Sequence, residues 1–593
     1  PFQTSGRSRP RPGLRHLGDR ACLRNDDSTG RSGRLPLVTW RHWRHRCVGL
    51  DPGLQHSRFQ ERKLQQRQLI MYLILKKFIG ALNINKSILS KELFFILGKT
   101  SKIKLFLFIM LLTTVVYFFS YLLSPFSNGD PAFYTIIGRS YIRDWILPYG
   151  YIFDHKPIFI YVLYGLWDMI FPFFNGKFAI LSILLSIFFV FSCSYFGKYN
   201  KLVAAFILLV VGSPFDPLSG NSEILIVSFE AVCFFFIVSG NKKNKSYYYI
   251  LSGFIAALVL NINYLSVVCL SFPLMILLFL EKKNLLRRTL FFSTGLFVGF
   301  AFIFIPFFIK GNHALENYFY LQSNYMNHYS GSYSDRVFSL LLESTYGIIS
   351  IPVFLLWIDN KISNLWRRDL TLPAWAASSF IATLLSGHPF SHYFLLCFAP
   401  ISIMMAILIQ EHKKIRAWYI YFILSGSMVF MAQEARQNFR TYTFNQRIDF
   451  NKIDAEIGKN SVLSIRAYQT LFYFSHISSF DKYLFHTHID ILYGNHADQY
   501  FILDLKKKPK YVVTEYNACT LHKITNNICD ILSEKYTIFY EKSVREGKYN
   551  RFSITIYKIR WDRFCNGYIL LLFPLYKTRK QSPPRKFGPA IQM

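Results

Sequence analysis

The sequence predicts a polytopic α-helical membrane protein of about 11 spanning helices, followed by a small extracytoplasmic α/β domain. Of its 593 residues, 52% are hydrophobic and only 17% are charged. Apolar runs of about twenty residues recur along the chain, and short β-like runs replace them after residue 440. This composition excludes a disordered chain and an ordinary soluble enzyme.

Eleven apolar runs are expected to span the membrane, because a helix needs about 20 residues to cross about 30 Å of hydrocarbon. These runs are 105–123, 177–197, 202–218, 222–239, 246–262, 264–281, 289–309, 337–358, 371–386, 392–410 and 417–433. A further run, 157–174, carries Asp168 and Pro172, and a central Asp costs about 2.5–3.5 kcal/mol on insertion. We expect that run to be interfacial or re-entrant.

Loop charge predicts the orientation once 157–174 is placed at the surface, since cytoplasmic loops carry an excess of Lys and Arg. Fifteen such residues then fall on one side, in loops 198–201, 240–245, 282–288, 359–370 and 411–416. The later loops of the other side, which are 219–221, 263, 310–336 and 387–391, hold only Lys310 and Arg336. The N-terminus is therefore expected inside, and everything after 433 outside.

The two ends of the chain differ from its middle in composition. Residues 1–70 contain fourteen Arg and show no periodicity, so we interpret them as a non-native or disordered extension upstream of a natural start at Met71. The transmembrane domain is expected over 100–435 and the extracytoplasmic α/β domain over 440–560, with a tail of uncertain status at 561–593.

Within 440–560, three runs read as strands: Ser461–Ile465, Tyr511–Thr514 and Phe552–Tyr557. A helix is expected between the second and third strands, over Ala518–Leu532. Cys519 and Cys529 lie in this region and would pair if it is extracytoplasmic, although two free thiols fit the sequence equally well.

The net charge of +34 would suggest a nucleic-acid partner in a soluble protein, but here the basic residues divide between the first seventy residues and the membrane loops. We therefore expect no nucleic acid as a partner. The sequence contains no CxxC motif and no cluster of ligands at metal-binding spacing, so a divalent metal is not indicated.

Asp130 is a candidate catalytic residue because it follows the first span, between Gly129 and Pro131. A carboxylate at the membrane surface could act as a general base toward an acceptor hydroxyl. An N-cap role fits equally well, because Asp before Pro is a common helix start. Sequence alone does not separate the two.

The same predicted outer loop ends with Asp154, His155 and Lys156. Lys156 could neutralise a lipid phosphate, and a lysine that merely reaches toward the headgroups is as common. Asp154 is the second candidate catalytic carboxylate. Further candidates for substrate binding share the predicted outer face; these are Tyr134, His155, Asn221, Glu223, His388 and His392.

Four segments carry a family resemblance: Asn128-Gly-Asp-Pro-Ala-Phe-Tyr134, Ile146-Leu-Pro-Tyr-Gly150, Phe153-Asp-His-Lys-Pro157 and Gly387-His-Pro-Phe-Ser-His-Tyr-Phe394. They resemble motifs of the GT-C membrane glycosyltransferases, in the branch that contains protein O-mannosyltransferases and aminoarabinose transferases. The resemblance covers roughly 100–560. Many relatives have a second Pro where this chain has Ile158, and a Lys in the span that here reads Asn261-Ile-Asn-Tyr264.

The resemblance implies an inverting transfer of a sugar from a polyprenyl-phosphate carrier to an extracytoplasmic lipid, glycan or protein. Asp130 matches the family's loop Asp, and Lys156 matches its loop Lys. The implied partners are the lipid-linked donor, the cell-envelope acceptor and membrane lipids, and the implied location is the bacterial inner membrane. No certain cofactor is implied.

Two other function classes remain open. A lipid or polysaccharide transporter or flippase would use intramembrane charges, for which Glu230 and Glu343 are the main candidates. An O-antigen polymerase or ligase would share a large outer loop. The crowding of polar residues on one face, and the early position of the Asp130 to Lys156 loop, favour the glycosyltransferase.

Overall fold

The structure is a computed structural model of the chain, which divides into residues 1–98 and 99–593. The residues that it describes all belong to the second unit. They are 101–124, 129–150, 152–172, 174–279, 284–328, 353, 357, 370–388, 390–411, 417–445, 448–467, 470–475, 477–484, 486–515, 518–519, 524–542 and 554–560. The extension 1–70, the tail 561–593, Glu343 and nearly all of the predicted span 337–358 lie outside this part.

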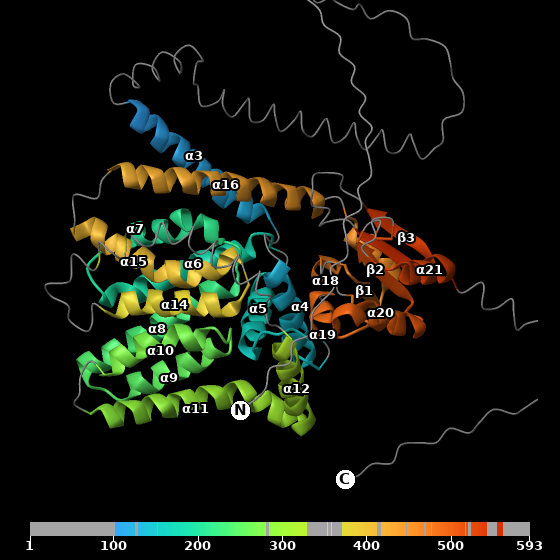
Figure 1. The fold of residues 1–593 in the computed structure, drawn as a ribbon, viewed down its shortest axis with the longest axis horizontal. Helices are drawn as coiled ribbons and strands as arrows, with labels where there is room; N and C mark the ends of the chain where they lie inside the picture. The colour runs from blue at the N-terminus through green and yellow to red at the C-terminus, as the bar shows by residue number, and fades with distance from the viewer. Residues whose placement is uncertain are drawn as a thin grey trace, which may run out of the picture. The chain divides into compact units, whose positions relative to one another are not determined.

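All the regular elements of the described chain between 101 and 445 are helices (Figure 1). Its helices are α3 (Ser101–Leu123), α4 (Gly129–Asp144), α5 (Ile158–Ile170), α6 (Lys177–Ser192), η1 (Cys193–Tyr195), α7 (Lys201–Phe206), the π-helical η2 (Ile207–Val211), η3 (Ser213–Phe215), α8 (Ser222–Lys243), α9 (Tyr247–Leu260), α10 (Ser266–Phe279), α11 (Leu285–Lys310), α12 (Asn312–His328), α14 (Thr371–Ser386), η5 (Ser391–Phe394), α15 (Leu395–Glu411) and α16 (Ala417–Asn445).

Five of these helical segments are long and apolar enough to cross a membrane by length and composition; they are Leu105–Leu123, Lys177–Tyr195, Ser222–Lys243, Leu285–Lys310 and Ser391–Gln410. Shorter apolar helices occupy Lys201–Val211, Tyr247–Leu260, Ser266–Phe279 and Thr371–Ser386, where the sequence predicted further spans. The mostly helical class is confirmed, and the number of crossings stays a prediction. The run 157–174 contains α5, whose 13 residues are too few to span.

The structure corrects the predicted loop 310–336, because its first half is the helix α12. Tyr318, Leu321, Gln322 and Tyr325 are buried along it, at the spacing of one helix face. The polar residues between these four lower the hydropathy of 312–328 below that of a membrane span. The helical spacing of the four buried residues is nevertheless present in the sequence. α16 likewise continues to Asn445, twelve residues beyond the predicted end at 433.

Two glycines bring α4 against α5. A Cβ at Gly138 would lie 2.2 Å from the carbonyl oxygen of Tyr161, and one at Gly165 would lie 2.4 Å from the carbonyl oxygen of Gly138. Neither position admits a side chain without moving backbone. The close approach places the start of α4, with Asp130, beside the loop that leads into α5.

Two acidic groups inside apolar helices accept hydrogen bonds from neighbouring helices. Asp168 in α5 accepts hydrogen bonds from Arg139 of α4 and Lys177 of α6, so the charge that made this run unsuited to the membrane is paired. Glu230 in α8 accepts a hydrogen bond of 2.7 Å from the indole of Trp375 in α14. Its other oxygen, Oε1, has no hydrogen-bond partner among the described residues.

The C-terminal region is an α/β domain with one four-stranded sheet. Its elements are α17 (Phe450–Ile457), β1 (Val462–Ile465), α18 (Thr470–Phe474), α19 (His486–Tyr493), η6 (Gly494–His496), α20 (Ala497–Lys506), β2 (Tyr511–Glu515), α21 (Asn526–Lys535), β3 (Tyr536–Lys542) and β4 (Ile554–Ile559). The strand order is β1-β2-β4-β3, with β1 parallel to β2 and both other pairs antiparallel. The three predicted strands are present.

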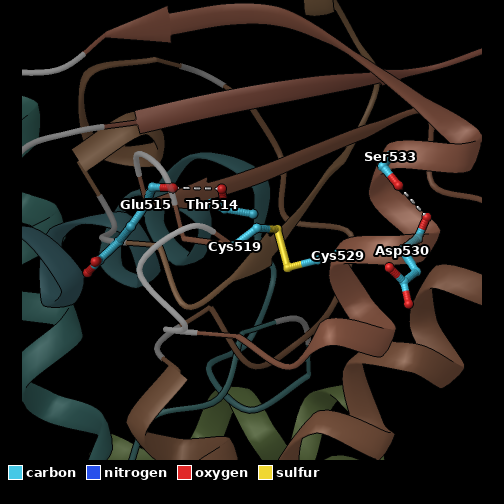
Figure 2. Close-up of a disulfide and its surroundings, with 6 residues drawn as sticks. All are labelled: Thr514, Glu515, Cys519, Cys529, Asp530 and Ser533. Atoms are coloured by element: carbon cyan, nitrogen blue, oxygen red, sulfur yellow. Dashed lines mark hydrogen bonds between the residues drawn. A yellow bond between two sulfur atoms is a disulfide. The ribbon is translucent and has the colours of Figure 1, made fainter.

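Two details of this domain differ from the prediction. The helix expected over 518–532 begins later, at Asn526, and β3 was not predicted, although its Tyr, Thr, Ile and Phe residues favour a strand. Cys519 and Cys529 form a disulfide that joins the segment after β2 to α21 (Figure 2). Of the two alternatives for these cysteines, the paired one is therefore observed.

Candidate functional site

Four segments that are distant in the sequence meet around the predicted site residues. They are the first turn of α4, the loop that ends at Pro157, the residues that begin α8, and η5. Asp130, Lys156, Glu223 and His392 interact electrostatically across these segments. Four of the residues predicted from sequence are thus brought together by the tertiary fold.

Asp130 lies in the first turn of α4 and is half-buried. Its Oδ2 lies 3.5 Å from the hydroxyl of Tyr134, one helical turn later. Burial raises the pKa of the Asp130 carboxyl, while His392 and Lys156 act in the opposite direction. A carboxylate with a raised pKa is a better proton acceptor than an exposed Asp, which suits a general base. Because α4 begins at Gly129, Asp130 lies inside the first turn and not at the N-cap position that the sequence suggested, although its negative charge there suits the helix dipole.

Lys156 is held firmly at its backbone, where its carbonyl oxygen accepts hydrogen bonds from the hydroxyls of Tyr149 and Tyr161. The side chain is only 5% exposed. Its Nζ lies 5.7 Å from the ring centroid of Tyr393 and, within the described residues, makes no hydrogen bond and no ion pair. The amino group of this largely buried lysine has no hydrogen-bonding anion among the described residues, so it is suited to receive one.

Asn221 and Glu223 begin α8 and are buried, at 2% and 0% exposure. Asn221 occupies the N-cap position, yet its side chain makes no capping hydrogen bond. Among the described residues, both polar atoms of its amide and the Oε2 of Glu223 lack a hydrogen-bond partner. Buried polar atoms are usually paired, so these three atoms are available to a bound molecule.

The two histidines predicted in the segment 387–394, His388 and His392, both stack on the ring of Phe390, which lies between them in the sequence. His388 and His392 each lie 5.5 Å from its ring centroid, with the rings nearly parallel. His392 interacts electrostatically with Asp130 and Lys156. The structure therefore joins His392 to the candidate site.

Asp154 is buried, and both of its oxygens are engaged. Oδ2 accepts a hydrogen bond of 2.8 Å from Tyr161, and Oδ1 lies 2.9 Å from Nδ1 of His155 and 3.3 Å from Nε2 of His488. Burial by itself would raise the pKa of Asp154, but the two histidines outweigh it and hold that pKa well below its ordinary value. Burial lowers the pKa of His155 to about 4. Because both oxygens of Asp154 already have partners, a positioning role suits this residue better than a catalytic one.

Sequence reasoning missed His488, because it lies in α19 of the C-terminal domain and no spacing rule links it to the first loop. It also missed Gln322 of α12, whose amide donates hydrogen bonds to the carbonyl oxygen of His155 and to the hydroxyl of Tyr264. The buried face of α12 was the one signal that could have pointed to Gln322. Both residues support the loop that carries Lys156.

No protein-family profile matches the chain, and no curated protein sequence matches it. Solved structures similar to the chain include ArnT from Cupriavidus metallidurans bound to undecaprenyl phosphate, with 12% identity over 78% of this chain and 98% of that one and a TM-score of 0.49. AglB, an archaeal oligosaccharyltransferase from Archaeoglobus fulgidus in complex with an inhibitory peptide and a dolichol-phosphate, has 11% identity over 70% of each chain and a TM-score of 0.40.

An Archaeoglobus fulgidus oligosaccharyltransferase tethered to an acceptor peptide is also similar, with 11% identity over 75% of this chain and 74% of that one and a TM-score of 0.41. Because all three TM-scores are below 0.5, the assignment of a reaction depends on the side chains of this chain.

Proposed function

We propose that the chain is an inverting membrane glycosyltransferase that transfers a sugar from a polyprenyl-phosphate carrier to an extracytoplasmic acceptor. The observation that carries this proposal is Lys156, a residue only 5% exposed whose amino group has no hydrogen-bonding anion among the described residues and interacts electrostatically with Asp130. A site with a free cation and a carboxylate fits a phosphate leaving group and an acceptor that must lose a proton.

The proposed reaction is a single displacement at the anomeric carbon. The acceptor hydroxyl or amine loses its proton to Asp130 and attacks that carbon, while the bond to the phosphate oxygen breaks and its electron pair leaves with the phosphate. Lys156 stabilises the negative charge on the departing lipid phosphate. Attack opposite the leaving group inverts the configuration of the sugar.

The remaining predicted residues are assigned to binding. Asn221 and Glu223 offer three unpaired buried polar atoms, which suit the hydroxyl groups of a sugar. His392 and Tyr134 contact or interact with Asp130 and orient it. Asp154 and His155 shape the loop that presents Lys156. His388 is proposed to line the same outer face.

The site is proposed to face the extracytoplasmic side of the plasma membrane, which in bacteria is the inner membrane. The fifteen basic residues on the opposite loops support this orientation. The disulfide between Cys519 and Cys529 supports it independently, because disulfides persist in oxidising compartments.

The proposal is tested by mass spectrometry of cell-envelope lipids, glycans and proteins from a deletion strain that carries either the wild-type chain or Asp130→Asn. We expect a sugar-sized mass difference in one fraction, present with the wild type and absent with the variant. Identical spectra in all three fractions would contradict a transferase and favour a transporter.

A further inference from the structure

A second polar site lies at the end of the helices where the basic loops gather. A pocket opens there between the start of α9 and the start of α11. Its lining includes Ser246, which precedes α9, and Asn284, Arg287 and Arg288 at the start of α11. The loop charges predict that this end is cytoplasmic, on the side of the membrane opposite the candidate site.

The charge around this pocket is strongly positive. Arg287 and Arg288 lie in the first turn of α11, where the helix dipole disfavours cations, and the first turns of α9 and α11 contain no acidic residue. The two neighbouring loops add five more basic residues, which are Lys242, Lys243, Lys245, Lys282 and Lys283. In the sequence between 240 and 291, Glu281 is the only acidic residue. A bound anion would offset this accumulation of positive charge.

Close packing of α9 against α11 brings the pocket residues together (Figure 1). A Cβ at Gly253 of α9 would overlap the carbonyl oxygen of Phe292, and one at Gly295 of α11 would overlap a carbonyl oxygen of α9. Further along both helices, a Cβ at Gly299 would lie 2.6 Å from that of Ala257. The two helices therefore run in the same direction, and their positively polarised N-terminal ends lie at the same end of the pair.

The polar side chains of the pocket are arranged for an anion with several oxygens. Nη2 of Arg287 donates a hydrogen bond of 3.0 Å to the hydroxyl of Ser246, which leaves the hydrogen of that hydroxyl able to donate. Arg288 is only 4% exposed, and its guanidinium carbon lies 5.8 Å from the ring centroid of Tyr249. Guanidinium groups match the oxygens of a phosphate in a two-pronged geometry.

The apolar surface beside the pocket favours a lipid as the source of the phosphate. α11 is long and apolar enough to cross a membrane, and Leu286, Leu290 and Phe297 are exposed along it. At 3.6 residues per turn these three share one face of the helix, next to the face of Arg287. The pocket thus combines basic groups with an adjacent apolar face, as a ligand with a charged head and hydrocarbon chains requires.

We propose that this pocket binds the phosphate headgroup of an anionic phospholipid, from the leaflet on the side opposite the candidate site. Ser246, Arg287 and Arg288 contact the phosphate oxygens, and the acyl chains lie along the exposed face of α11. Basic pockets between membrane helices on the cytoplasmic side bind anionic headgroups in this way. The inference does not depend on the reaction proposed above.

The test uses the full-length chain, purified in detergent. Native mass spectrometry counts the lipids retained after addition of phosphatidylglycerol, which is anionic, or of phosphatidylcholine, which has no net charge. Inorganic phosphate is added as a competitor in a third sample. Arg287→Gln removes one exposed charge from the pocket, and Lys198→Gln removes an exposed charge that is predicted on the same side but does not line the pocket.

We expect the wild type and Lys198→Gln to retain one phosphatidylglycerol in preference to phosphatidylcholine. Arg287→Gln should bind phosphatidylglycerol at least about fivefold more weakly, because one basic side chain near an anionic membrane surface changes the affinity by about that factor. Equal retention of both lipids by the wild type, or unchanged binding by Arg287→Gln, would overturn the site. Displacement of the lipid by an equal concentration of inorganic phosphate would assign the pocket to a free phosphate and overturn the lipid.

Lys156→Met separates this pocket from the candidate site, which would also attract a lipid phosphate. This variant should retain phosphatidylglycerol like the wild type, whereas loss of the lipid in Lys156→Met and not in Arg287→Gln would contradict the proposal. The lipid preference of the wild type is measured without any variant, so it decides the question even if Arg287→Gln does not fold. None of these readouts uses sugar transfer, so a failed lipid site and a failed glycosyltransferase assignment are distinguishable.

Discussion

Asp168 of α5 accepts a hydrogen bond of 2.9 Å from the Nε of Arg139 in α4, and the buried Lys177 of α6 binds its other oxygen. Arg139 also donates to the carbonyl oxygen of Tyr473 in the C-terminal domain. One carboxylate thus holds three helices together, and its arginine reaches the α/β domain.

Asp168→Ala should destabilise the protein, because it leaves the ammonium of Lys177 buried without its partner. Removing one member of a buried ion pair costs about 3–5 kcal/mol. Thermal unfolding in detergent should show a lowered melting temperature. Glu316→Ala, which breaks an exposed pair with His313, is the control and should leave the melting temperature unchanged. Equal melting temperatures for wild type and Asp168→Ala would contradict a structural role for the pair.

Asp130→Asn should abolish turnover while the protein still inserts and folds. Loss of a general base typically lowers the rate by about 10²–10⁴-fold. If Asp130 only began α4, the substitution would be almost neutral, since Asn serves at a helix start as well as Asp. Sugar transfer by the purified variant distinguishes the two roles. Asp144→Asn, at the exposed end of the same helix, is the matched control and should retain full activity.

The rate of sugar transfer by the wild-type chain should fall at low pH. The midpoint of this fall should lie above the ordinary Asp pKa of about 3.9. Burial raises the pKa of Asp130, so its carboxyl takes up a proton at a higher pH than an exposed Asp does. The base is therefore active above this raised pKa and is lost as the pH falls through it. A profile of kcat/KM against pH measures the midpoint. A rate that stays flat down to the ordinary Asp range would argue against a buried base.

Lys156→Met should weaken binding of polyprenyl phosphate, because it keeps the length of the side chain but removes the charge that faces the phosphate. We expect a raised KM for the donor together with a lowered kcat, since the same cation contacts the substrate and stabilises the leaving group. Binding of undecaprenyl phosphate by itself, without a sugar, provides a direct readout. Lys459→Met, an exposed lysine of the C-terminal domain, should leave both measurements unchanged.

Cysteine labelling tests the orientation. Ser323 of α12 and Lys242 at the end of α8 are both exposed, and the loop charges place them on opposite sides of the membrane. In a chain whose unpaired cysteines outside the described helices are replaced by serine, Ser323→Cys should react with an impermeant reagent in intact cells, and Lys242→Cys only after lysis. The reverse pattern would overturn the orientation and place the site in the cytoplasm.

The sequence determined the features that depend on local composition. Among the described residues, hydropathy placed most of the apolar helices to within a few residues, as for Thr371–Ser386, because a helix that meets lipid or a helical core is mainly apolar. The loop motifs pointed to Asp130 and Lys156 because both are unusual residues beside apolar runs. Short runs of β-branched residues likewise indicated β1, β2 and β4.

Only the tertiary structure decided which polar residues meet. The close contact at Gly138 and Gly165 places Asp130 beside the Lys156 loop, and no sequence rule predicts such a contact between two helices. The sequence does not predict the contact between His155 and His488 of α19 either, since these residues are 333 positions apart. Hydrogen bonds and ion pairs act over a few ångströms in space, whereas periodicity and charge counts report on neighbours along the chain, so the assembly of the site required the folded structure.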